Sequence, residues 1–349
     1  MALSVPRPVV HHILDYCGLD PNGSEGIPIR DGLYEVFTDV QHTKKADEIA
    51  HQLFISYDTL SSATFNPDDD HTQRSRALIL EGADLCGRKD RVIVLAPGPL
   101  EPIKELSKLF KEVVLVGYDP ALLAKFATGL HNVTLIQCDL TGGLFGRISA
   151  IFERARIEKQ NRHVVVCKLY DLLRDDRKKK GDDLSALGLA DYVISSNLLS
   201  QLSECIYAYC KEFDEKLPKG SSNQSDMVML VKHTFEEWDE VLSERHIENL
   251  SQLTRSSSGA PSIVCLADTI TRGQFEITNG KREWVSEVRF SEFGPGLESV
   301  TEKINKTFVV EKTSKWLWDI GLPGIYSSDP TRGYGYGVKA FLLKSPPTG

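Results

Sequence analysis

From Arg91 onward the hydrophobic pattern alternates between two periods. Short apolar runs typical of buried strands are followed by stretches in which apolar residues recur every three or four positions, as on one face of a helix. Strands that alternate with helices indicate βαβ units and a parallel sheet. The predicted strands are 91–97, 112–119, 132–139, 189–197 and 262–270, and the predicted helices among the first of them are 100–110, 120–130 and 144–157.

The C-terminal pattern is different, because strand-like runs follow one another without helices. Asn279-Gly280 lies between two such runs and is a hairpin signal. Residues 314–321 and 333–344 predict two final strands, which add antiparallel pairing to the parallel sheet. The glycines of 331–337 favour a bulged or closely packed strand over a phosphate cradle, because no helix follows to supply N–H groups.

The flanking and connecting segments are less regular. Residues 1–88 have helix-like patterning, interrupted by the polar stretch 65–75, which reads as a loop. We therefore expect a helical N-terminal cap over 1–88 and an α/β domain over 89–349. Further helices are predicted at 198–218 and 227–253; 163–173 fits a strand or a helix, and the mixed-charge run 174–183 reads as a solvated loop.

Composition sets limits on the class of protein. With 41% hydrophobic and 26% charged residues, the chain can bury a sizeable core. The net charge of −8 gives no general attraction to nucleic acid, and no apolar run approaches the roughly 20 residues of a membrane span. Seven scattered cysteines predict free thiols and a reducing, cytoplasmic compartment. Neither Cys205 and Cys210 nor His233 and His246 share a helix face, so no metal site is predicted.

The candidate chemistry lies where the predicted strands end, since ligands of open α/β sheets bind beyond the carboxyl ends of the strands. The first strand is followed by a turn that contains Gly98, where a ligand can approach the backbone. Asp119 ends the second strand 21 residues later, near the spacing at which a carboxylate accepts two hydrogen bonds from a ribose diol. Asp139 ends the third strand, and Ser196 and Asn197 end the fourth.

Four segments together resemble the successive motifs of class I S-adenosylmethionine-dependent methyltransferases. They are VIVLAPGPLEP, VVLVGYDPALL, NVTLIQCDLTG and DYVISSNLLSQL, within a resemblance that covers roughly residues 85–345. It implies a Rossmann-like three-layer α/β sandwich with a mostly parallel seven-stranded sheet and a C-terminal antiparallel hairpin. It also implies S-adenosylmethionine as cofactor, S-adenosylhomocysteine as product, and methyl transfer to an unidentified small molecule, protein or RNA.

The resemblance also implies roles for individual residues. The first loop passes under the methionine part of the cofactor, the acid after the second strand holds the ribose, and the acid after the third contacts the adenine amine. The end of the fourth strand faces the methyl group and the acceptor, and Asn197 and His246 are the candidates for catalysis. The expected cofactor-binding residues are Ala96, Pro97, Gly98, Tyr118, Asp119, Cys138, Asp139, Leu140, Ser196 and Asn197.

The first motif departs from the family pattern. Val94 stands where the family has an acid that serves the cofactor's amino group, and Ala96 and Leu100 stand where it has glycines. These departures from the motif support an alternative function, in which a methyltransferase-like protein binds a partner without catalysis. A nicotinamide-dependent oxidoreductase is a further alternative, which the missing glycines disfavour.

Several candidates also have structural interpretations. Asp119 can cap the helix that begins at Pro120, Asp139 can cap the turn that follows it, and Asn197 can cap the next helix. His246 can be a structural histidine instead of a general base. DNA is a disfavoured acceptor, because the chain is acidic and lacks the Asn/Asp-Pro-Pro-aromatic signature. A protein partner could bind the N-terminal cap or the insertion at 158–188.

Overall fold

The structure is a computed structural model, and it divides the chain into two compact units, residues 1–73 and 74–349. The predicted N-terminal cap lies almost entirely outside the described residues and stays a prediction. The structure describes residues 70–98, 101–117, 120–160, 162–176, 184–196, 198–199, 241–254, 261–278, 281–289, 300–321 and 332–346.

Five parallel strands form the centre of the sheet, in the order β3-β2-β1-β4-β5. All five were expected from the hydrophobic pattern, and most are shorter than predicted. The strands are β1 (Arg91–Leu95), β2 (Glu112–Gly117), β3 (Val133–Gln137), β4 (Tyr192–Ser196) and β5 (Ile263–Thr278).

Antiparallel strands complete the sheet. β8 (Arg332–Lys344) pairs with β5, β7 (Val309–Gly321) pairs with β8, and β6 (Lys281–Arg289) pairs with the far half of β5. Seven strands follow one another across the sheet in the order β3-β2-β1-β4-β5-β8-β7, and β6 is an eighth strand that pairs with β5 outside this order. The Rossmann-like fold with a C-terminal antiparallel hairpin is thus confirmed.

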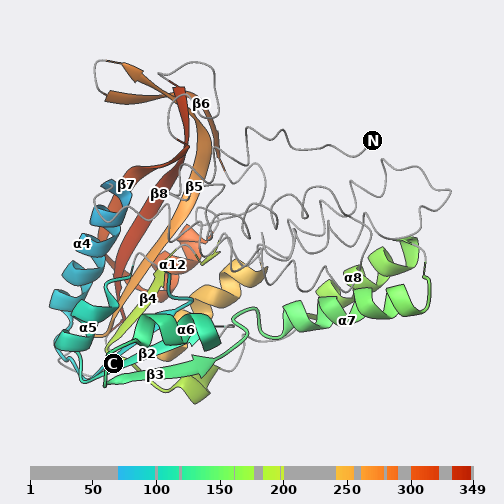
Figure 1. The fold of residues 1–349 in the computed structure, drawn as a ribbon, viewed down its shortest axis with the longest axis horizontal. Helices are drawn as coiled ribbons and strands as arrows, with labels where there is room; N and C mark the ends of the chain where they lie inside the picture. Colours follow the sequence, from blue (N-terminus) through green and yellow to red (C-terminus); the bar gives the residue numbers. More distant parts are fainter. Residues whose placement is uncertain are drawn as a thin grey trace, which may run out of the picture. The chain divides into compact units, whose positions relative to one another are not determined.

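One strand is longer than the sequence pattern predicted. β5 pairs with β4 only through Ala267, and it continues for eleven more residues beside β8 and β6 (Figure 1). The predicted strand 262–270 and the first arm of the predicted hairpin are therefore one element. The pattern suggested two elements because residues 271–274, TRGQ, are polar.

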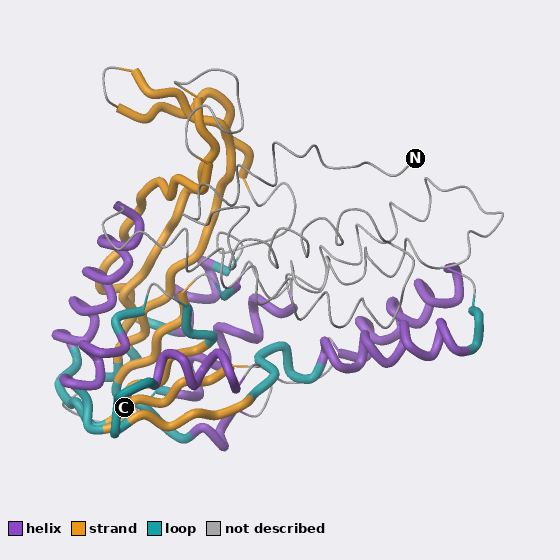
Figure 2. Tube along the Cα trace, in the orientation of Figure 1, coloured by secondary structure: helices purple, strands orange, loops and turns teal. Residues whose placement is uncertain are grey.

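Helices cover both faces of the sheet and make three layers (Figure 2). The division follows from strand alternation: Val92 and Val94 of β1 face one layer, whereas Ile93 and Leu95 face the other. The first layer contains α4 (Asp70–Leu85), α5 (Ile103–Leu109) and α6 (Pro120–Ala127). The second contains α7 (Leu144–Ile157), α8 (Arg162–Asp176), the 3-10 turn η1 (Leu184–Leu187), the helix 241–253 and α12 (Thr301–Thr307).

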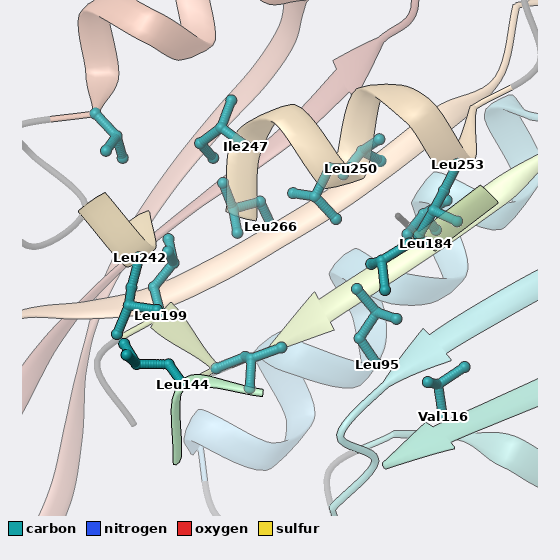
Figure 3. Close-up of a cluster of buried hydrophobic side chains, with 14 of the residues drawn as sticks. Leu95, Val116, Leu144, Leu184, Leu199, Leu242, Ile247, Leu250, Leu253 and Leu266 are labelled. Atoms are coloured by element: carbon teal, nitrogen blue, oxygen red, sulfur yellow. The ribbon is translucent and has the colours of Figure 1, made fainter. Parts of the chain in front are cut away.

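The second layer is held by aliphatic side chains. In Figure 3, Ile247, Leu250 and Leu253 of the helix 241–253 lie above the strands that carry Leu95 and Leu266. All five side chains are fully buried. This helix is the described part of the predicted helix 227–253, whose earlier residues lie outside the described ranges.

The first layer depends on a glycine. A Cβ built on Gly82 of α4 would lie 2.4 Å from the hydroxyl oxygen of Tyr192, which donates a hydrogen bond to the carbonyl of Ile79 over 2.7 Å. Gly82 therefore allows α4 to pack directly against β4.

Two local predictions are corrected, and one open alternative is decided. The predicted loop 65–75 is helical from Asp70 onward. The segment 163–173, which fitted a strand or a helix, lies within a helix, α8. The run 174–183 is not simply a solvated loop, because its residues 174–176 are helical and Asp176 is fully buried. Its charge is matched by two arginines that are distant in sequence, which composition alone does not reveal.

The glycine-rich entrance to β8 is a bulged strand, as predicted. Gly337 pairs with Thr271 where the register between β5 and β8 shifts, and a Cβ on it would lie 2.2 Å from the Thr271 hydroxyl oxygen. The tryptophans of β7 serve packing: Trp316 is buried, and the Trp318 ring lies 5.7 Å from the ring of Tyr336.

Candidate functional site at the carboxyl edge

The candidate site is the edge at which the parallel strands end. In the order across the sheet, β3 ends at Gln137, β2 at Gly117, β1 at Leu95 and β4 at Ser196. Neighbouring strands are about 4.8 Å apart, so the edge from β3 to β4 extends over about 14 Å. Residues that follow these strands are therefore spread along a line that suits an elongated ligand.

The chain leaves β1 through a strained residue. Ala96 has a φ of 46°, in the left-handed region, and its N–H donates to the carbonyl of Val116 over 2.7 Å. A residue with a side chain pays about 1–2 kcal/mol for this conformation. Ala96 stands at the position of a glycine in the methyltransferase motif. Its backbone has the left-handed conformation that favours glycine, although the residue is alanine.

Glu101 is a site residue that sequence analysis did not identify. Its carboxylate accepts a hydrogen bond of 2.6 Å from the N–H of Gly98, and the residue is 7% exposed although it lies in the turn before α5. The only sequence signal was an acid three residues after Gly98, between Leu100 and Pro102.

The Glu101 carboxyl is in an unusual electrostatic position. Burial raises its pKa, and the N–H of Gly98, its own N–H and the Ser196 hydroxyl partly oppose that rise. Within the described part of the chain, no lysine, arginine or histidine forms an ion pair with it. A buried carboxylate without a cation is costly, so this position favours a positively charged ligand.

Two consecutive serines end β4 and face opposite layers, as strand alternation requires. Ser195 is fully buried, and its Oγ lies 2.8 Å from Nε2 of His246 in the helix 241–253. Ser196 faces the layer of α4 and α5, where Glu101 lies. Its hydroxyl acts to lower the pKa of Glu101, but its Oγ makes no hydrogen bond of ordinary geometry among the described residues. The end of β4 thus contacts one ionisable side chain in each layer.

His246 lies behind the edge. It is 3% exposed, and burial lowers its pKa from 6.5 to about 4, so the ring is neutral near pH 7. Its described contact is with Ser195 Oγ, so a proton that it exchanged with an acceptor would pass through that hydroxyl. This geometry suits a positioning residue better than a base in direct contact with an acceptor.

Asp139 follows β3 and organises the turn into α7. Its Oδ1 accepts hydrogen bonds from the N–H of Thr141 over 2.9 Å and from the Thr141 hydroxyl over 2.6 Å. This is the capping role that the sequence allowed. Both bonds use Oδ1, and the second oxygen takes part in neither.

A buried cluster of charges lies beneath this turn. Asp176, at the end of α8, pairs with Arg147 of α7 and, over 2.8 Å, with Arg245 of the helix 241–253. Arg147 also donates to the carbonyls of Gly142 and Gly143, in the turn that Asp139 caps. The cluster therefore joins three helices, α7, α8 and 241–253, to the loop after β3.

The structure brings part of the predicted set to one edge. The members that it places there are Ala96, Pro97, Gly98, Cys138, Asp139, Leu140 and Ser196. Tyr118, Asp119 and Asn197 lie outside the described residues, directly after β2 and β4. Their roles stay predictions.

Other expectations concern metals, thiols and membranes. Cys86, Cys138, Cys167 and Cys265 are free thiols. The described segments hold no group of three or more histidine, cysteine, aspartate or glutamate side chains that could hold a metal ion. Of the helices in those segments, none has the length and apolar character needed to cross a membrane.

Comparison with known proteins gives weak similarities to solved methyltransferases. Neither a family model nor a curated protein sequence matches the chain. The N-methyltransferase NodS from Bradyrhizobium japonicum WM9 is 9% identical with a TM-score of 0.39, over 80% of this chain and 99% of that one. The 1,6-didemethyltoxoflavin-N1-methyltransferase of Burkholderia thailandensis is 10% identical with a TM-score of 0.38, over 87% and 91%. A putative RNA methyltransferase from Pyrococcus horikoshii is 11% identical with a TM-score of 0.34, over 78% and 83%.

Similarities at this level carry no argument about activity. The fold assignment rests instead on the order and direction of the strands. Five parallel strands with helices on both faces and a closing antiparallel hairpin define a Rossmann-like α/β protein.

Proposed function

We propose that the chain binds S-adenosylmethionine along the carboxyl edge of β3, β2, β1 and β4 and transfers its methyl group to an acceptor. One observation carries the proposal: residues from four motifs, which are far apart in sequence, follow the ends of four adjacent strands in the order in which an extended nucleoside cofactor would meet them.

In this arrangement each loop contacts a different part of the cofactor. Asp139 and its neighbours after β3 receive the adenine, Asp119 after β2 receives the ribose hydroxyls, and the loop Ala96–Gly98 passes beneath the methionine. Ser196, at the end of β4, and Asn197, directly after it, lie beside the methyl group and the acceptor. The edge of about 14 Å is long enough for these tasks to be separate.

Methyl transfer from S-adenosylmethionine needs little acid–base catalysis. A sulfonium methyl is already activated, so holding a nucleophilic acceptor in line with it does most of the work. This suits an edge where the described histidine, His246, is neutral and set back behind Ser195. The acceptor can be a small molecule, a protein or an RNA, and a protein acceptor could dock on the N-terminal region or on residues 158–188.

The first test is binding. Calorimetric titration with S-adenosylhomocysteine, S-adenosylmethionine and NAD(H) should detect the two sulfur ligands, and Asp119→Ala should weaken them more than tenfold. Asp191→Asn, at the opposite edge of the sheet, is the control and should leave affinity unchanged in the folded protein. Failure of either sulfur ligand to bind at millimolar concentration would refute the proposal, and NAD(H) binding alone would favour an oxidoreductase.

The second test is transfer. Incubation with methyl-labelled cofactor and a cell extract, followed by separation of protein, RNA and metabolite fractions, should place the label in one fraction. Binding without transfer in any fraction would favour a binding protein that has lost catalysis. The strained Ala96 and the departures of the first motif make this outcome informative.

A further inference from the structure

The position of Glu101 has a consequence for how a ligand is held. Its carboxylate is buried at the ends of β1 and β4, beside the N–H of Gly98 and the hydroxyl of Ser196. These are the loop and the strand end that the proposed function assigns to the methionine part of the cofactor. Sequence resemblance gave Glu101 no role, although the first motif segment, VIVLAPGPLEP, includes it.

Three features separate this carboxyl from an ordinary structural acid. It is buried, and no cation among the residues that the structure describes is paired with it. The adjacent residue Ser196 is 9% exposed, and its Oγ makes no hydrogen bond of ordinary geometry in the described part of the chain. A buried acid and a buried hydroxyl with spare capacity, side by side, form an incomplete polar site.

The chemistry of such a site specifies its ligand. A carboxylate accepts hydrogen bonds, and a charge-assisted bond to an ammonium group is about twice as strong as a neutral one. The ligand group that completes the site is therefore cationic and carries N–H donors. Val94, in the place of the family's acid, is fully buried and supplies no charge.

We propose that Glu101, assisted by the Ser196 hydroxyl, receives the α-ammonium group of the cofactor's methionine end and so replaces the acid missing at Val94. This inference rests on the proposed function. It assigns a specificity-determining residue that approaches from the turn before α5, on the layer of α4 and α5, and not from the end of β1.

The test compares two ligands that differ in this group. S-adenosylhomocysteine has the α-ammonium group, whereas 5′-methylthioadenosine keeps the adenosine and the sulfur but lacks the amino acid end. Glu101→Gln should weaken S-adenosylhomocysteine more than tenfold and change the affinity for 5′-methylthioadenosine by less than twofold. Glu101→Asp keeps the charge and should recover part of the lost affinity.

The matched control is Glu105→Gln, four residues later in α5. Glu105 pairs with Arg76 of α4 over 2.8 Å, so the Glu105→Gln substitution should leave both affinities unchanged. Melting curves confirm that each variant is folded.

The outcomes separate this inference from the proposed function. If the wild-type chain does not bind S-adenosylhomocysteine, both fail. If it binds and Glu101→Gln binds equally well, or loses both ligands equally, Glu101 does not receive the ammonium group and the proposed function stands. If Glu101→Gln binds more tightly, the carboxylate blocks the N–H of Gly98, and the inference is overturned.

Discussion

Each edge of the parallel sheet holds a buried acid that accepts hydrogen bonds from backbone N–H groups, and the surroundings of the two acids differ. At the amino edge, Asp191 lies between β1 and β4, and its Oδ2 accepts hydrogen bonds from the N–H groups of Asp90 and Arg91 over 2.9 and 3.0 Å. At the carboxyl edge, Glu101 is equally buried but has no paired cation among the described residues, and Ala96 is strained. Asp191 at the amino edge is satisfied by backbone N–H groups and has no described neighbour in a strained conformation. At the carboxyl edge, the Ser196 hydroxyl beside Glu101 makes no hydrogen bond of ordinary geometry among the described residues, and a ligand would satisfy it.

This contrast gives a physical reason to look for function at one edge. Backbone strain and unsatisfied hydrogen-bonding groups reduce the stability of the folded state, and they are concentrated at sites that bind ligands or catalyse reactions. Three predictions test the contrast through stability.

The largest effect is expected at the amino edge. Asp191→Ala removes the acceptor of two partly buried N–H groups, and an N–H group left unsatisfied on burial costs about 1–3 kcal/mol. We expect the free energy of unfolding to fall by about 4 kcal/mol, measured by urea denaturation at pH 7. Glu101→Gln is the comparison at the carboxyl edge.

Glu101→Gln should leave the free energy of unfolding unchanged or raise it. Burial raises the pKa of this carboxyl, so ionisation at neutral pH disfavours the folded state, and an amide of the same shape can still accept from the Gly98 N–H. Equal destabilisation by both substitutions would show that the two acids have the same structural role, and the contrast between the edges would be lost.

The second prediction concerns pH. Burial lowers the pKa of His246 to about 4, so below pH 6.5 the unfolded chain takes up a proton that the folded chain does not. Stability therefore falls as the pH drops from 6.5 to about 4, by about 3 kcal/mol from this residue. Denaturation of the wild type and of His246→Gln across this range should show a flatter dependence in the variant.

Other groups titrate in the same range, but they contribute to both proteins and cancel in the difference. An unchanged slope would mean that His246 is accessible to water in the folded state. Its hydrogen bond to Ser195 would then not be a buried support of the carboxyl edge.

The hydrophobic pattern predicted which strands form the sheet. It also predicted the bounds of α7, because Gly142 and Gly143 precede this helix and its apolar spacing ends at Ile157. It also identified three strand ends, at Ala96, Asp139 and Ser196, that the structure brings to one edge. Whether these residues bind a cofactor stays a prediction.

What the sequence did not reveal depends on tertiary partners. Glu101 folds back toward Gly98 and Ser196, and no periodicity predicts where a side chain in a turn will be directed. Asp176 lies in a mixed-charge run that is typical of a loop, yet its partners Arg147 and Arg245 are 29 and 69 residues away. Local composition contains no information about such distant pairs.

The smallest expected effect is at Ala96, and it has the opposite sign to that of Asp191→Ala. Ala96→Gly removes a left-handed alanine, which is worth about 1–2 kcal/mol, but adds the larger chain entropy of glycine to the unfolded state, about 0.5–1 kcal/mol. We expect a net stabilisation of about 0.5–1 kcal/mol by chemical denaturation.

The matched control is Ala124→Gly, the same substitution on the exposed surface of α6, where the backbone is helical. There glycine should destabilise by about 1 kcal/mol. The difference in sign isolates backbone strain from the general effect of glycine. If both substitutions destabilise equally, the turn after β1 is relaxed with alanine in place, and the carboxyl edge stores no strain at this position.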